Sequence, residues 1–65
     1  NAVKELKLVG IIWSSAPQAI IEQPKDARTH LLGTGDTLGP LRVKKIFQDR
    51  VILGRNDGPQ EWELR

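Results

Sequence analysis

Short apolar runs alternate with turn-forming residues along the whole chain. Six runs rich in β-branched or aromatic residues cover positions 6–13, 19–22, 28–32, 41–47, 50–54 and 60–65. Regularly spaced short strands separated by turn signals are typical of a small sandwich or barrel. No window of useful length keeps the 3.6-residue period of an amphipathic helix. We therefore predict an all-β fold of six strands, in one domain that spans residues 1–65 and begins with a flexible lead-in at 1–5.

The first run is apolar on both of its predicted faces. Because side chains alternate along a strand, one face is expected to hold Leu6, Leu8, Gly10 and Ile12. The opposite face then holds Lys7 and three large apolar residues, Val9, Ile11 and Trp13. A strand with one solvated face does not need apolar residues on both sides. The second face is therefore either a contact surface for a partner or covered by the other sheet.

The middle of the chain contains a turn, a loop and one irregular strand. Residues 24–27 are typical of a turn, and residues 33–40 form a predicted loop with three glycines and a proline. In the run 41–47 the apolar residues Val43 and Ile46 are three positions apart, which breaks strict alternation. A β-bulge at Lys44-Lys45 would return Ile46 to the core face.

The last two strands alternate simply. Val51 and Leu53 share one face after a tight hairpin at Gln48-Asp49. Following a second turn signal at residues 56–59, Trp62 and Leu64 are predicted to point inward, while Glu61, Glu63 and Arg65 face solvent.

Composition restricts the chemistry that the chain can perform. With no cysteine and a single histidine among 65 residues, neither a disulfide nor a zinc site of ordinary composition is expected. Ten Lys and Arg against eight Asp and Glu leave a net charge of +2, which is too small to indicate nucleic acid by itself. No apolar run reaches the length of about 20 residues that spans a bilayer. Because the first residue is Asn1, we expect a fragment whose membrane anchor lies outside it.

Residues that resemble catalytic or ligand-binding motifs have simpler structural interpretations. His30 with Ser14 or Ser15 would supply part of a hydrolytic triad, but nothing in the sequence brings them together. Residues 33–35 lack the following Lys and Ser or Thr of a phosphate-binding loop, so we interpret their glycines as turn residues. We therefore expect no catalytic residue, no cofactor and no metal site.

Taken in order, several segments resemble the periplasmic homology region of protein C of the type II secretion system. They are Leu8-Val9-Gly10-Ile11-Ile12, Ala19-Ile20-Ile21-Glu22, Gly35-Asp36 with Leu38, Val43 with Ile46, Asp49-Arg50-Val51-Ile52-Leu53, Gly58 and Glu61-Trp62-Glu63-Leu64. The likeness extends over residues 6–64. It implies a fold in which the six strands form two three-stranded antiparallel sheets.

A sister family, the type IV pilus biogenesis lipoprotein that binds the secretin, shares part of this pattern. The shared segments are Ala19-Ile20-Ile21, Pro24 and Gly35-Asp36-Thr37-Leu38-Gly39. The segments at 49–53 and 61–64 favour the secretion protein. Thr34 departs from the pattern, because the family has a strand hydrophobe there. The departure implies that the third strand ends earlier or that the following loop is longer.

Both resemblances imply a docking role in the periplasm without catalysis. The expected partners are the N-terminal periplasmic domains of the secretin, which is the outer-membrane channel, and other inner-membrane components of the secretion system. Our candidate contact residues are Leu8, Val9, Gly10, Ile11, Ile12 and Trp13. An alternative of another class is a small basic barrel that binds nucleic acid through Arg42, Lys44, Lys45 and Arg50. The absence of exposed aromatic residues interleaved with these cations argues against that alternative.

Overall fold

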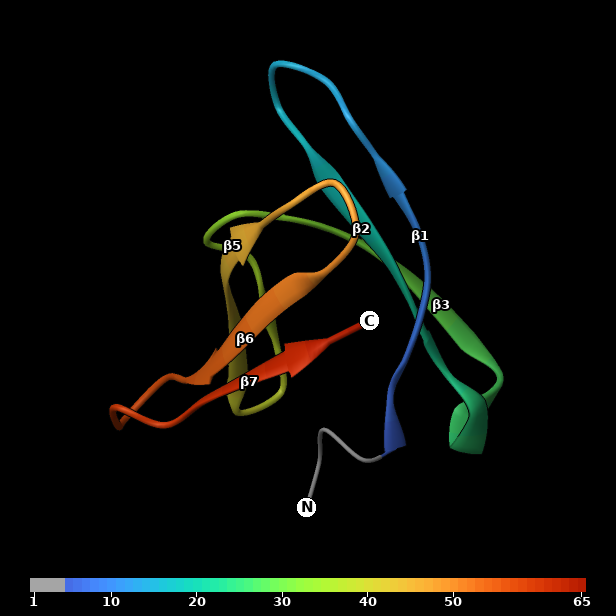
Figure 1. The fold of residues 1–65 in the computed structure, drawn as a ribbon. Helices are drawn as coiled ribbons and strands as arrows, with labels where there is room; N and C mark the ends of the chain where they lie inside the picture. Colours follow the sequence, from blue (N-terminus) through green and yellow to red (C-terminus); the bar gives the residue numbers. More distant parts are fainter. Residues whose placement is uncertain (1–4) are drawn as a thin grey trace.

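The computed structural model describes residues 5–65, which form two antiparallel sheets (Figure 1). The first sheet has three strands in chain order, β1 (Lys7–Ile12), β2 (Gln18–Gln23) and β3 (Arg28–Gly33). The second has four, also in chain order, β4 (Thr37–Leu38), β5 (Leu41–Ile46), β6 (Val51–Arg55) and β7 (Glu61–Leu64). The predicted lead-in at residues 1–5 falls mainly on residues 1–4, which lie outside the described residues.

The predicted all-β class is confirmed, and the described sheets form a sandwich and do not close into a barrel. One detail of the prediction is wrong, because the second sheet has a fourth strand. The segment expected to be a loop contains β4, in which Thr37 pairs with Arg42 and Leu38 with Leu41. Gly39 has a φ of 59° and is the first residue of the two-residue turn between these strands, where a hairpin requires positive φ.

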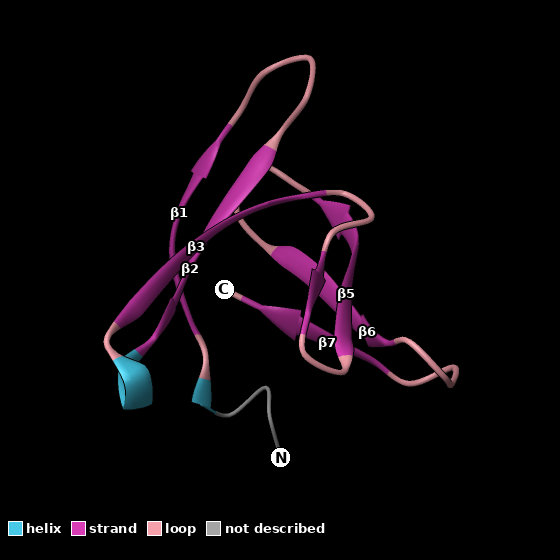
Figure 2. Ribbon diagram, turned by 180° about the vertical axis from the view of Figure 1, so that it is seen from behind, coloured by secondary structure: helices cyan, strands magenta, loops and turns pink. Residues whose placement is uncertain are grey.

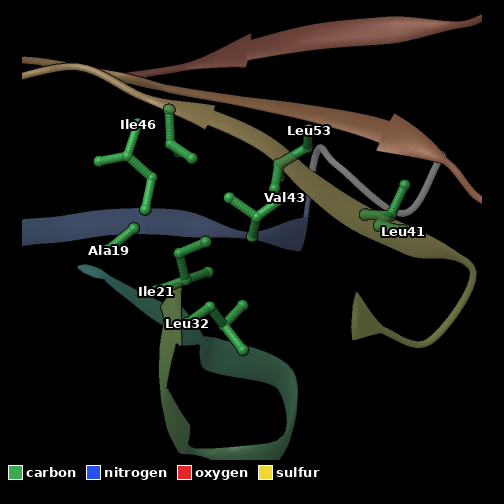
Figure 3. Packing of buried hydrophobic residues seen from close by; sticks show 8 residues of the cluster. Ala19, Ile21, Leu32, Leu41, Val43, Ile46 and Leu53 are labelled. Atoms are coloured by element: carbon green, nitrogen blue, oxygen red, sulfur yellow. The ribbon is translucent and has the colours of Figure 1, made fainter. Parts of the chain in front are cut away.

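The core lies between the sheets and consists only of apolar side chains (Figure 3). Both sheets contribute to its eight buried apolar side chains, which are Ala19, Ile21, Leu32, Leu41, Val43, Ile46, Val51 and Leu53. Half-buried residues close the rim of this cluster, namely Leu6, Leu8, Ile11, Leu38, Trp62 and Leu64. The predicted inward orientation of the last two strands is therefore confirmed.

The predicted bulge in β5 is also confirmed. Val43 pairs with Leu53 and Lys45 pairs with Ile52, so Lys44 is the extra residue. The insertion returns Ile46 to the core, where only 5% of its surface is exposed.

A second bulge, in β1, overturns the faces predicted for the first strand. Leu8 pairs with Ile21 and Gly10 with Ile20, which leaves Val9 as the extra residue. One inserted residue reverses the faces of everything that follows it. Ile11 therefore joins Leu8 against the core, whereas Ile12, predicted to share a face with Leu8, points outward and is 43% exposed.

The turns use the residues that the sequence indicated. A single 3₁₀ turn, Pro24–Asp26, connects β2 to β3 (Figure 2), and Ala27 follows it in the left-handed region with φ 52°. After β3, the N–H of Gly33 donates to Asp36 Oδ2 at 2.8 Å, and Gly35 has a φ of 93°. The 33–35 segment is thus a turn, and the chain leaves β3 before Thr34. None of the helical turns among residues 5–65 is long and apolar enough to cross a membrane.

Candidate interaction surface

Four large apolar side chains of the described residues are strongly exposed. They are Val9, Ile12, Trp13 and Leu31, with between 43% and 54% of their surface accessible. Single exposed apolar residues are ordinary on protein surfaces, but a contiguous group marks an interaction site. Their arrangement in the sheet therefore decides what they mean.

Two apolar doublets explain how one face of the three-stranded sheet becomes apolar. Ile20-Ile21 lies in β2 and Leu31-Leu32 lies in β3. Because neighbouring side chains of a strand point to opposite faces, and because Ile21 and Leu32 are in the core, Ile20 and Leu31 point outward. They also stand opposite each other in the sheet register.

The same row continues into β1. Gly10 pairs with Ile20, and a Cβ built on Gly10 would lie 3.7 Å from Ile20 Cδ1. Val9, displaced by the bulge, and Ile12 lie on this side as well, since both are exposed and their neighbours Leu8 and Ile11 face the core. We name this surface the outer apolar face and define it by Val9, Gly10, Ile12, Ile20 and Leu31.

Polar residues border the outer apolar face along the strand direction. The row that contains Lys7, Glu22 and Thr29 lies at one end. At the other end, Gln18 and Gly33 stand beside Ile12. An apolar centre with a polar border is the usual anatomy of a protein–protein contact.

The free edge of β1 is less suited to a partner than this face. β1 is the first strand of its sheet, so one of its edges has no neighbouring strand within residues 5–65. A bulge at Val9 and a lysine at position 7 are features that disfavour the addition of a further strand. Packing against the face is therefore the better supported mode of contact.

The structure divides the six predicted contact residues into two groups. Leu8 and Ile11 are half-buried and pack on the core, on the side of the sheet that faces away from the outer apolar face. Val9, Gly10 and Ile12 lie on the outer apolar face, and Trp13 is exposed just beyond the end of β1. Sequence reasoning missed Ile20 and Leu31, although each belongs to an apolar doublet in which one member has to face outward.

Trp13 lies at a second feature, a shallow hollow between β1 and the β5–β6 turn. The hollow is lined by Trp13, Phe47, Gln48, Asp49 and Arg50. Two cations lie over the ring of Phe47, with Arg50 Cζ at 4.2 Å and Lys45 Nζ at 5.0 Å from its centroid. At this corner the exposed Trp13 and the half-buried Phe47 therefore lie beside basic residues, a proximity that the sequence pattern does not predict.

The outer face of the four-stranded sheet is charged. Across it, Arg42 pairs with Gly54 and Gly54 with Glu61, while Lys45 pairs with Ile52 and Ile52 with Glu63. Each row thus has a cation on β5 and a carboxylate on β7.

Glu63 is linked by ion pairs to charged residues that lie outside these two rows. Arg50 contacts Asp49 at 2.8 Å and Glu63 at 3.1 Å. Glu63 also accepts a hydrogen bond from Arg65 Nε at 2.7 Å, and this bond raises the pKa of the Arg65 guanidinium. Arg50 and Arg65 are therefore paired with carboxylates of this chain, whereas Lys45 takes part in none of the four ion pairs of the described residues.

The residues considered for catalysis have other contacts. His30 Nε2 lies 3.1 Å from Gln23 Oε1 in the half-buried part of β3. The Ser14 hydroxyl accepts a hydrogen bond from the N–H of Ala16 within the β1–β2 turn. Among residues 5–65, no three His, Asp or Glu side chains gather closely enough to hold a metal ion.

Two surface features of the described residues bear on function. The outer apolar face has a defined border and the corner at Trp13 has a defined lining. In comparisons with protein-family models, with curated proteins and with solved structures, no match is found for this chain.

Proposed function

We propose that this chain is a non-catalytic docking module that binds a protein partner through the outer apolar face. The observation that carries the proposal is the continuous apolar row from Gly10 through Ile20 to Leu31, extended by Val9 and Ile12. Removing such a surface from water is favourable by about 25 cal/mol per Å². A partner that covers the face gains this free energy without rearranging the core.

For the partner we propose the N-terminal periplasmic domains of a secretin. The domain then links the inner-membrane platform of a type II secretion system to the outer-membrane channel, working in the periplasm and held by an anchor outside this sequence. Support comes from the order and spacing of the segments at 8–12, 19–22, 49–53 and 61–64. A type IV pilus lipoprotein domain would use the same face in the same way.

The size of the face predicts a weak contact. One side of a 65-residue domain is small, and interfaces below about 1,200 Å² in total are typical of transient complexes. Many copies arranged around a ring-shaped channel would raise the effective affinity by avidity. We therefore expect micromolar binding by the isolated domain.

The experiment is titration calorimetry of this domain against isolated secretin N-terminal domains. Val9→Asp and Leu31→Asp place a charge at either side of the outer apolar face, and we expect each to weaken binding about tenfold or more. Thr29→Asp is the matched control, because Thr29 is exposed on the same face and strand as Leu31 but lies in the polar border. Ile11→Asp is unsuitable, since Ile11 packs on the core.

Two results would contradict the proposal in different ways. Normal binding by both Asp variants, with folding verified by near-ultraviolet circular dichroism, would show that the face is not the contact. A wild-type domain that fails to bind the secretin domains at all would exclude this partner.

A further inference from the structure

The hollow at Trp13 is chemically different from the outer apolar face. Trp13 follows the last residue of β1 and is 53% exposed, and Phe47 begins the turn between β5 and β6. These two aromatic residues come from different sheets and line one hollow. Aromatic side chains are frequent anchor points of protein interfaces, since they bury a large area on contact.

The charges around this hollow are unequal. Arg50 is bound by both Asp49 and Glu63. Lys45, whose ammonium lies over the Phe47 ring, has no carboxylate within 4.0 Å among the described residues. Lys45 is therefore the cation at this corner that remains able to pair with an incoming anion.

We infer that this corner is a subsite for a partner segment in which an apolar side chain neighbours a carboxylate. The apolar side chain occupies the hollow between Trp13 and Phe47, and the carboxylate pairs with Lys45. The inference deepens the proposed function and rests on it for the identity of the partner. The chemistry of the segment follows from the corner itself.

A nucleic-acid strand fits the corner less well. Sites for single strands combine aromatic platforms with a groove of unpaired cations that follow the backbone. Here Arg50 is already bound by two carboxylates, so Lys45 is the one cation beside the hollow without an ion pair among the described residues, and one cation cannot follow the backbone of a strand. A single carboxylate beside an apolar group needs only the one cation that Lys45 offers.

The inference is tested with two blocked peptides, acetyl-Leu-Glu-Leu-Glu-amide and its Gln counterpart, acetyl-Leu-Gln-Leu-Gln-amide. The indole N–H signal of Trp13 reports binding in a nitrogen-15 correlation spectrum, and Trp62→Phe leaves Trp13 as the single indole. We expect the acidic peptide to bind about threefold more tightly, which is the range of one exposed ion pair. The difference should shrink in about 0.5 M salt, where such pairs are screened.

Charge-reversal variants locate the carboxylate. Lys45→Glu should remove the preference for the acidic peptide. Lys44→Glu makes the same change in net charge at the neighbouring exposed position, whose side chain lies against Gly54, and should leave the preference intact. Trp13→Ala should weaken secretin binding by about tenfold, as expected for an anchor residue.

Each remaining outcome has a defined meaning. The inference is overturned if neither peptide shifts the Trp13 signal, or if an oligothymidylate of about eight nucleotides shifts it more strongly than the acidic peptide does. Secretin binding that is unchanged in both Trp13→Ala and Lys45→Glu overturns the inference and leaves the proposed function standing. Conversely, a Lys45-dependent preference for the acidic peptide without any secretin binding removes the proposed partner and keeps the subsite.

Discussion

The two sheets of this sandwich share one core but have chemically opposite outer faces. On the four-stranded sheet, the outer row of Arg42, Gly54 and Glu61 places a cation and a carboxylate on either side of a glycine. On the three-stranded sheet, the corresponding position is the row of Gly10, Ile20 and Leu31. The first face is covered by its own side chains, since a Cβ at Gly54 would collide with Lys44. On the second face, Val9, Ile12 and Leu31 remain exposed among residues 5–65.

Each sheet contains one β-bulge, and the two bulges have different consequences. In β5 the inserted residue is Lys44, which adds a charge to a charged face. In β1 it is Val9, which adds a 54% exposed apolar side chain to an apolar face. A β-bulge therefore makes one outer face more polar and the other outer face more apolar.

The largest expected effect separates the two sides of β2. Ile21→Ala removes a fully buried side chain, and we expect it to lower the free energy of unfolding by about 3 kcal/mol. The neighbouring Ile20→Ala makes the same chemical change on the outer apolar face, and we expect a loss below about 1 kcal/mol. Urea denaturation of both variants measures the difference. Equal losses would show that Ile20 is packed as tightly as the core.

An intermediate effect is expected from deleting the inserted residue of each bulge. Without Val9, side chains of β1 alternate simply through Leu8, Gly10 and Ile11. Without Lys44, those of β5 alternate simply through Val43, Lys45 and Ile46. We expect a loss of about 1 kcal/mol for the deletion in β1, which is an edge strand, and about 2 kcal/mol in β5, which has strands on both sides. Thermal and urea unfolding of the two deletions test this order.

The deletion of Val9 also bears on function. It removes one apolar side chain from the outer apolar face without altering Ile20 or Leu31, so secretin binding should weaken but persist. A deletion in β1 that unfolds the domain would mean that the bulge is required for the fold and is not only an addition to the surface.

The two bulges also show how far the sequence predicts this fold. In β5 the pair Lys44-Lys45 between Val43 and Ile46 makes the break in alternation visible, and the bulge was predicted at the right place. In β1 the residues from Leu8 to Ile12 are all apolar or glycine, so two registers fit the pattern equally well. A bulge can be predicted from the sequence where charged residues interrupt the alternation, but not where every residue of the strand is apolar.

The candidate site was only partly predictable for the same reason. Val9, Gly10, Ile12 and Trp13 were proposed from the first strand alone, but Ile20 and Leu31 join them only through the register of the sheet. The corner at Trp13 depends on Phe47, which is distant in sequence and lies in the turn that follows β5 of the other sheet. The alternation of side chains within one strand does not show which residues of other strands or turns lie beside it.

The smallest expected effect compares the two glycines at the centre of the outer faces. Gly10 lacks a positive φ, and an added Cβ would lie in ordinary contact with Ile20 at 3.7 Å. Gly10→Ala should therefore stabilise the domain by about 0.5 kcal/mol, mainly by restricting the unfolded chain. At Gly54 the added Cβ would approach Lys44 Cε to 2.5 Å and the carbonyl oxygen of Gln60 to 3.3 Å.

Gly54→Ala should consequently destabilise by about 0.5 to 1 kcal/mol, because the lysine stem has to move and the backbone of Gln60 cannot move easily. Opposite signs for the same substitution, measured by urea denaturation, would show that one face is already packed by its own chain and that the other retains room for a partner. Gly10→Ala would then also leave secretin binding intact or improve it, since the new methyl group enlarges the apolar row. If both glycine variants lose stability alike, the face at Gly10 is closed as well, and the contrast between the two sheets no longer explains where a partner binds.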